Sequence, residues 1–126
     1  MGLYSSDLER LGMLSWEALR AARLVVDSGI HVMGWSEQQA TDFLLARTSM
    51  SPRQASAQVG RYIGTPGQAS SYLIGMLEIR RLRDEAQRAL GDRFDLRAFH
   101  DRVPERGSIP LPVLREEIGR WLEERR

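Results

Sequence analysis

The chain has 126 residues, which is about the size of one small domain and enough to bury a modest core. Its 18 basic residues, all arginine, are interspersed with 17 acidic residues to give a formal charge of +1, so the composition carries no electrostatic signature of a nucleic-acid or anionic-membrane binder. The lack of cysteine excludes disulfides and thiolate metal sites, and no segment approaches the ~20 apolar residues of a membrane span.

The hydrophobic pattern is helical through nearly the whole chain, and no run alternates as a half-buried strand would. The sequence therefore predicts an all-α fold. The first helix is expected to begin near Asp7, with Ser5 and Ser6 as candidate caps. It is expected to end at about Gly29 or Gly34.

Two short helices are predicted next. Ser36 followed three residues later by Gln39 has the pattern of a capping box and opens the first of them. Ser51 followed by Pro52 repeats the start signal, because proline is favoured at the first position of a helix.

A breaker over residues 64–67 then precedes a second long helix, expected over residues 68–90 and stopped by Gly91. Asp95 is expected to cap a further short helix. The last helix is expected to begin at about Pro112.

These elements predict a multi-helix bundle. The short pair between the two long helices has the lengths of a connecting hairpin, so we expect the long helices to pack antiparallel, with the shorter helices around them. Residues 1–126 are expected to form a single helical domain. An arginine-rich stretch in the second long helix is interleaved with acids at i+3 and i+4, which is typical of a solvated helix face.

Three polar residues of the first helix stand out by their spacing. Arg23, Asp27 and His31 follow one another at four-residue steps, which places them in one stripe of the helix. A carboxylate one turn from a histidine can hold its ring, and such a histidine can donate a hydrogen bond to a peptide carbonyl or oxyanion. The structural alternative is a partly buried salt-bridge ladder that locks this helix to a neighbour.

The start of the second long helix is the other candidate. Gln68 and Tyr72 share one face of its first turns, and Gly75 lies one turn further on. A tyrosine hydroxyl near a helix N-terminus can donate to a developing negative charge, and a small residue lets another backbone approach. The alternative is a core tyrosine whose hydroxyl is satisfied within the fold.

Several familiar motifs are missing from the sequence. It has no HExxH, no glycine-rich phosphate loop and no nucleophile elbow. The two histidines, His31 and His100, lie too far apart in sequence to form a zinc site with histidines at helical spacing. We therefore expect no metal ligands in this chain and read His100 as a structural or surface residue.

Three motifs in a fixed order carry a resemblance to a known family. They are residues 23–31 with 34–35, then Tyr62 followed by residues 66–69 and Tyr72, then residues 91–101. With these motifs the chain resembles the bacterial domain-of-unknown-function family numbered eight-eight-five, whose members look like zinc metallopeptidases with an HExxH motif. In that family the motifs form the C-terminal portion only. The resemblance therefore implies a helical fragment of a zinc-dependent metallopeptidase that lacks its metal site and is inactive alone.

The resemblance also implies roles for individual residues. His31 and Tyr72 match candidate donors to the carbonyl oxygen of a peptide, with Arg23, Asp27 and Gln68 in support. The chain departs from the family pattern at Ser28 and Ser70. It also has Leu73 where a basic residue is common in the family, which argues against substrate contact beside Tyr72.

The expected cofactor and partners follow from the same resemblance. Zinc is expected in the parent protein but not in this chain. The expected partners are the missing N-terminal segment, or a second copy, and a peptide substrate, with no nucleic acid and no membrane. A stand-alone helical interaction module without catalysis remains the alternative, and the cellular compartment stays open.

Overall fold

The structure is a computed structural model, and it describes residues 4–125 of the chain. These residues form six α-helices and one short 3-10 helix, and they include no strand. The chain divides into two compact units, Met1–Leu73 and Ile74–Arg126. The all-α prediction and the two long helices are confirmed, whereas the antiparallel packing of the long pair and the single domain stay predictions.

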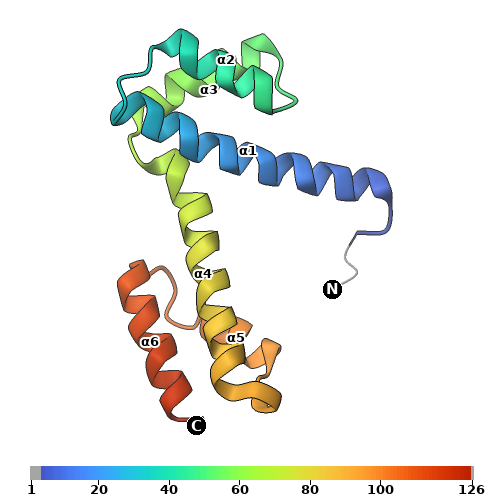
Figure 1. Ribbon diagram of the computed structural model, residues 1–126, viewed down its shortest axis with the longest axis vertical. Helices are drawn as coiled ribbons and strands as arrows, with labels where there is room; N and C mark the ends of the chain where they lie inside the picture. Colours follow the sequence, from blue (N-terminus) through green and yellow to red (C-terminus); the bar gives the residue numbers. More distant parts are fainter. Residues whose placement is uncertain (1–3, 126) are drawn as a thin grey trace. The chain divides into compact units, whose positions relative to one another are not determined.

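The first unit contains α1 (Asp7–His31), α2 (Glu37–Arg47), α3 (Pro52–Gly64) and the beginning of α4 (Gln68–Leu90). Within it, α1 packs on both α2 and α3, and these two form a hairpin against each other (Figure 1). Each of the three helices starts with a serine in a complete capping box. The serines are Ser6, Ser36 and Ser51.

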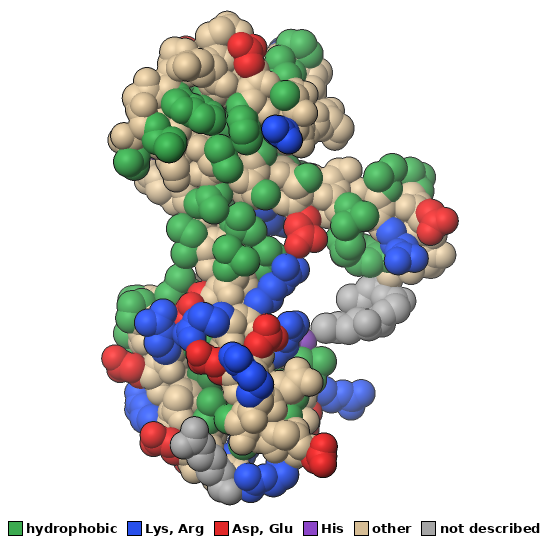
Figure 2. Space-filling model, viewed as in Figure 1, with side chains coloured by type: hydrophobic (Ala, Val, Ile, Leu, Met, Phe, Trp, Pro, Cys, Tyr) green, Lys and Arg blue, Asp and Glu red, His purple; other side chains and the backbone are tan. Residues whose placement is uncertain are grey.

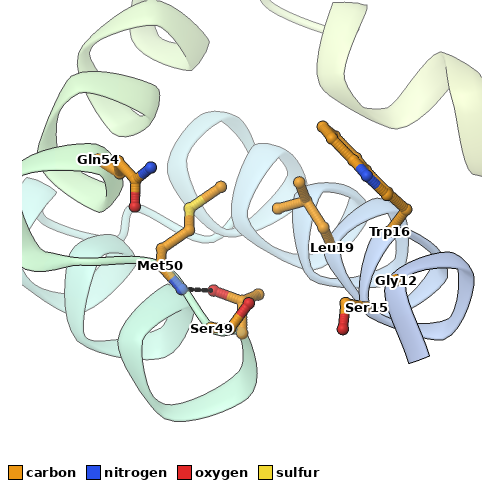
Figure 3. Close-up of a pocket in the computed structure, with 8 residues that line it drawn as sticks. Gly12, Ser15, Trp16, Leu19, Ser49, Met50 and Gln54 are labelled. Carbon is orange, nitrogen blue, oxygen red and sulfur yellow. Dashed lines mark hydrogen bonds between the residues drawn. The ribbon is translucent and has the colours of Figure 1, made fainter. Parts of the chain in front are cut away.

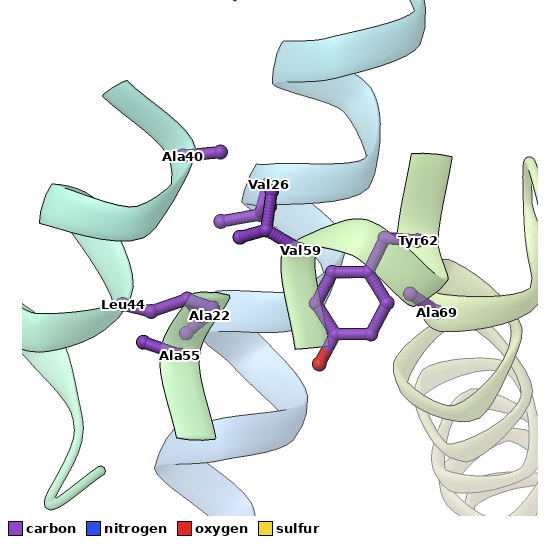
Figure 4. Packing of buried hydrophobic residues seen from close by; sticks show 8 residues of the cluster. All are labelled: Ala22, Val26, Ala40, Leu44, Ala55, Val59, Tyr62 and Ala69. Atoms are coloured by element: carbon purple, nitrogen blue, oxygen red, sulfur yellow. The ribbon is translucent and has the colours of Figure 1, made fainter. Parts of the chain in front are cut away.

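Small side chains let the helices of the first unit approach closely (Figure 4). Its buried cluster consists of Ala22, Val26, Ala40, Leu44, Ala55, Val59, Tyr62 and Ala69. Gly29 marks the tightest approach, because a Cβ added there would lie 2.5 Å from the Trp35 ring. The Trp35 ring therefore packs the loop after α1 directly against Gly29, and any larger residue at position 29 would clash with this ring.

The second unit contains the rest of α4, the 3-10 turn η1 (Gly91–Arg93), α5 (Leu96–Arg102) and α6 (Leu111–Glu123). Gly91 ends α4 with a φ of 53°, a conformation that glycine adopts without strain. The Asp95 side chain caps α5 by accepting hydrogen bonds from two backbone N–H groups, as the sequence predicted. Its core is more aromatic than that of the first unit and is formed by Leu82, Ala86, Leu90, Phe99, Leu114, Ile118 and Trp121.

Arginines surround the two carboxylates that are most enclosed in the second unit. Glu117 is buried and pairs with three arginines, Arg102 at 3.1 Å, Arg106 at 3.2 Å and Arg120 at 2.6 Å. Hydrogen bonds from Arg81, outweighing the effect of burial, and from Arg115 lower the pKa of Glu78 to about 2. The predicted i,i+3 and i,i+4 pairs on α4 are therefore present, but the Glu78 side chain is only 12% exposed rather than fully solvated.

No helix within residues 4–125 is long and apolar enough to cross a membrane.

Candidate functional site

The beginning of α4 is fixed by a carboxylate from α1. Gly67 directly precedes α4 with a φ of 79° and has no side chain with which to cap the helix. Asp27 takes that role: its Oδ1 accepts a hydrogen bond from the Gly67 N–H at 3.2 Å, and its Oδ2 accepts one from the Ser70 N–H at 3.0 Å. The Ser70 hydroxyl donates a third, short bond to Oδ2. Asp27 is only 2% exposed, so this buried contact ties α1 to the first turn of α4.

These hydrogen bonds determine the charge state of Asp27. Burial by itself raises the pKa of a carboxyl group, because it disfavours the charged form. Here the hydrogen bonds from Ser70 and Gly67, together with the nearby His31, outweigh burial and lower the pKa of Asp27 below its ordinary value. The site therefore holds a buried, charged carboxylate at neutral pH.

His31, the last residue of α1, is anchored through one ring nitrogen. Its Nε2 lies 3.0 Å from the backbone carbonyl oxygen of Tyr62 and 3.5 Å from Oδ1 of Asp27. Since a carbonyl oxygen can only accept, this contact assigns the proton to Nε2. The other nitrogen, Nδ1, is not used by these contacts, and a quarter of the side chain is exposed.

Arg23 organises the other two predicted residues. One of its Nη2 hydrogens is donated to Gln68 Oε1 at 3.1 Å, and the guanidinium lies 4.3 Å from the centre of the Tyr72 ring. The amide of Gln68 in turn points to the Tyr72 hydroxyl at 3.5 Å. This stacking holds a tyrosine that is 48% exposed.

All five predicted site residues therefore lie where α1 meets the first turns of α4. Asp27 and His31 form the predicted pair, but the predicted ladder is incomplete, because Arg23 contacts Gln68 and Tyr72 instead of extending it. That His31 and Tyr72 face one common groove stays a prediction. The expected role of Gly75 also stays a prediction, and a Cβ added there would meet none of the described residues within 4 Å.

Three residues of this junction were missed in the sequence. They are Gly67 and Ser70, which donate to Asp27, and Tyr62, whose carbonyl oxygen accepts from His31. One signal was available in the sequence. Gly67 stands in the capping position and has no side chain, so the free backbone N–H groups at the start of the helix need an acceptor from another part of the chain. Which side chain supplies the acceptor could not be read from it.

The junction does not form a metal centre. Among the described residues there is no group of three or more His, Cys, Asp or Glu side chains that could hold a metal ion. The zinc implied by the family resemblance therefore does not fit the residues of this chain, and zinc in a longer protein stays a prediction.

The fold and this junction define an all-α protein whose two long helices are joined by a buried, charged carboxylate. The model of a family described as bacterial protein of unknown function (DUF885) matches residues 1–118, so the chain belongs to that family. This confirms the family recognised in the sequence.

One solved structure extends this comparison. It is described as "the putative lipoprotein from Colwellia psychrerythraea" and is 41% identical to this chain, with a TM-score of 0.94. The match covers 98% of this chain but 21% of that one, so this chain spans about a fifth of the length of that relative. A search of curated proteins finds no match.

Proposed function

We propose that this chain forms the non-metal side of a peptide-hydrolysing site in a longer zinc-dependent metallopeptidase. His31 and Tyr72 would donate hydrogen bonds to the carbonyl oxygen of the substrate, with Arg23, Asp27 and Gln68 holding them in place. The coverage of about a fifth of the Colwellia protein supports a longer polypeptide around this fold. The metal ligands and the base would come from outside this chain, which would be inactive alone.

The observation that carries the proposal is the contact between Asp27 and the start of α4. His31 lies one turn after Asp27 on α1, and Tyr72 lies one turn after Gln68 on α4. Because Asp27 binds both His31 and the first turn of α4, the positions of the two donors are tied to one buried group. Such fixed donors stabilise developing charge without having to reorganise during the reaction.

The chemistry asked of each donor is simple. The Tyr72 hydroxyl donates directly to an oxyanion. A protonated His31 donates from Nδ1 while Nε2 stays on the carbonyl oxygen of Tyr62. Neither residue forms a covalent bond to the substrate in this proposal.

The test uses a chimaera in which this chain replaces the matched 21% of the Colwellia protein. We expect the chimaera to hydrolyse peptides, and Tyr72→Phe and His31→Gln each to lower kcat by about 10²–10³-fold, the usual cost of removing one oxyanion donor. Two matched controls are available: Tyr4→Phe, since Tyr4 is also 48% exposed, and the exposed His100→Gln. If the site variants lose no more activity than these controls, the assigned roles are wrong.

The alternative function is a helical interaction module without catalysis. It is favoured by the large apolar side chains that α1 exposes near its N-terminal end, including Leu8 and Leu11. The coding sequence upstream of Met1 distinguishes the two functions. An in-frame HExxH supports the peptidase, whereas an independent start with its own regulatory signal supports the module.

A further inference from the structure

Helix α1 is much longer than the helices that cover it. Its 25 residues extend over about 37 Å, whereas the 11 residues of α2 extend over about 17 Å. The buried residues of α1 all lie in its second half, between Ala22 and Gly29. The first half of α1 therefore extends beyond α2 and α3, as Figure 1 shows.

The apolar face of α1 does not end where this cover ends. Leu8 and Leu11 lie at helical spacings that place them on the same face as the buried Ala22 and Val26, and Trp16 lies at the edge of that face, about 80° around the helix from Val26. They are nevertheless 77%, 60% and 60% exposed. We call Leu8, Leu11 and Trp16 the α1 stripe, and Figure 2 shows hydrophobic side chains on the surface of this part of α1.

A hollow adjoins the stripe and continues it toward the hairpin. It has a volume of about 300 Å³ and is lined on α1 by Gly12, Ser15, Trp16 and Leu19 (Figure 3). Residues 48–50 and Gln54 form its other side. Gly12 and Ser15 are small, and a Cβ added at Gly12 would meet none of the described residues within 4 Å, so another helix can approach α1 closely here.

We propose that the α1 stripe and this hollow bind an amphipathic helix from the rest of a longer polypeptide, with one large apolar side chain of that helix inserted into the hollow. Single exposed apolar residues need no partner, but a stripe that continues a buried face beside a hollow is typical of an interface. The occupant is chosen from the comparison: the same fold occurs, at a TM-score of 0.94, within a chain of which it makes up 21%. The proposal rests on the longer polypeptide of the proposed function and is independent of hydrolysis.

The first test compares one substitution in two contexts, the isolated chain and the Colwellia chimaera. Leu8→Glu is expected to leave the Tm of the isolated chain nearly unchanged and to lower that of the chimaera by several degrees. Leu14→Glu is the matched control, because Leu14 is 55% exposed on the same helix but lies about 120° around it from Leu8. An equal effect of Leu8→Glu in both contexts would overturn the proposal.

The second test does not require a destabilised variant to fold. The chain has no cysteine, so single cysteines at positions 8 and 14 can be labelled with a maleimide. Leu8→Cys and Leu14→Cys are expected to react at similar rates in the isolated chain. In the chimaera Leu8→Cys should react at least about ten times more slowly than Leu14→Cys, as expected for a covered position. Equal rates in the chimaera would refute the docking site.

A second copy of the chain is the competing occupant. Sedimentation velocity of the isolated chain is expected to show a monomer at micromolar concentration. A dimer that Leu8→Glu dissociates and Leu14→Glu does not would assign the stripe to self-association and overturn the proposal. None of these measurements depends on peptide hydrolysis, so a failure of the peptidase proposal would leave the result interpretable.

Discussion

The two units neutralise their buried carboxylates by different means. In the second unit, Glu117 and Glu78 are surrounded by arginine side chains. In the first unit, Asp27 is held by two backbone N–H groups and a serine hydroxyl, with His31 at 3.5 Å. The ion pairs of Glu117 and Glu78 join side chains within the second unit. Asp27 instead contacts His31 and the first turn of α4, where the partly exposed Tyr72 lies.

The same contrast holds for apolar residues. Most of the exposed large apolar side chains in the described part of the chain belong to the first unit, where α1 carries its stripe. The second unit packs both Phe94 and Trp121 against the buried Phe99. The exposed apolar surface of the described residues is therefore concentrated in the first unit, which also contains the proposed site and the proposed docking surface.

The largest effect is expected from the aromatic core of the second unit. Phe99→Ala should cost about 3–5 kcal/mol, because Phe99 is fully buried against two other rings. Hydrogen exchange resolved along the chain should show this loss mainly in residues 74–125. Phe43→Ala, which removes a partly exposed ring of the first unit, is the control and should cost less. An equal loss of protection in both units after Phe99→Ala would mean that they do not fold as separate units.

Asp27→Ala should come next, at about 2–3 kcal/mol. The substitution leaves the buried N–H and hydroxyl of Ser70 and the partly buried N–H of Gly67 without their acceptor. Asp42→Ala, at an exposed position in the same unit, is the control and should change the urea midpoint little. If both variants have the same midpoint, the contact between α1 and α4 does not stabilise the fold.

Acid should lower the stability of both units, and added salt should change this effect more in the second unit than in the first. The folded-state pKa values of Asp27 and Glu78 lie below their ordinary values of 3.8 and 4.5, so the folded protein binds fewer protons than the unfolded chain. Their stabilisation is therefore present above about pH 4.5 and is lost as the pH falls, for Glu78 down to about 2. Added salt should reduce the Glu78 contribution, because the Arg81 and Arg115 side chains are 40% and 59% exposed, and should leave that of the buried Asp27 nearly unchanged.

Acid titration of the unfolding midpoint at low and high salt tests this difference. Asp27→Asn should make the stability of the first unit less dependent on pH, and Glu78→Gln should do the same for the second unit. If salt affects both contributions equally, the contrast between the two kinds of neutralisation is wrong.

The smallest effect is expected at Tyr62. Its hydroxyl is buried and has no hydrogen-bond partner among the described residues, so Tyr62→Phe removes an unsatisfied polar group. The free energy of unfolding should stay within about 0.5 kcal/mol of the parent value or rise slightly. Tyr62→Ala, which removes the whole buried ring, is the control and should cost several kcal/mol. A loss of about 1 kcal/mol in Tyr62→Phe would reveal a hydrogen bond to the hydroxyl.

Local signals in the sequence account for most of the helix boundaries. The capping box at Ser36, the helix start at Ser51 and Pro52, the stop at Gly91 and the cap at Asp95 are confirmed, because each depends on residues within four positions of one another. Helix α1 ends at His31, between the two glycines proposed for its end.

The contacts of the candidate site were only partly predictable. The spacing of Asp27 and His31 predicted their pairing on one helix. The donors to Asp27 lie 40 and 43 positions away, and no local pattern specifies such a distance. Which apolar residues stay exposed could not be predicted either, because Leu8 and Leu11 have the pattern of a buried face and only the lengths of α2 and α3 leave them uncovered.

The glycine before α4 has a consequence for the order of folding. A helix that starts with its own capping side chain can form its first turn early, but α4 takes its cap from Asp27, 40 positions away. Closing a flexible loop of that length costs about 3 kcal/mol of chain entropy, and the α2–α3 hairpin lowers this cost by shortening the span. The first turn of α4 should therefore form late, after the hairpin, and substitutions at Asp27 should speed unfolding rather than slow folding. The orientation of Tyr72 is then among the last features of the first unit to be set.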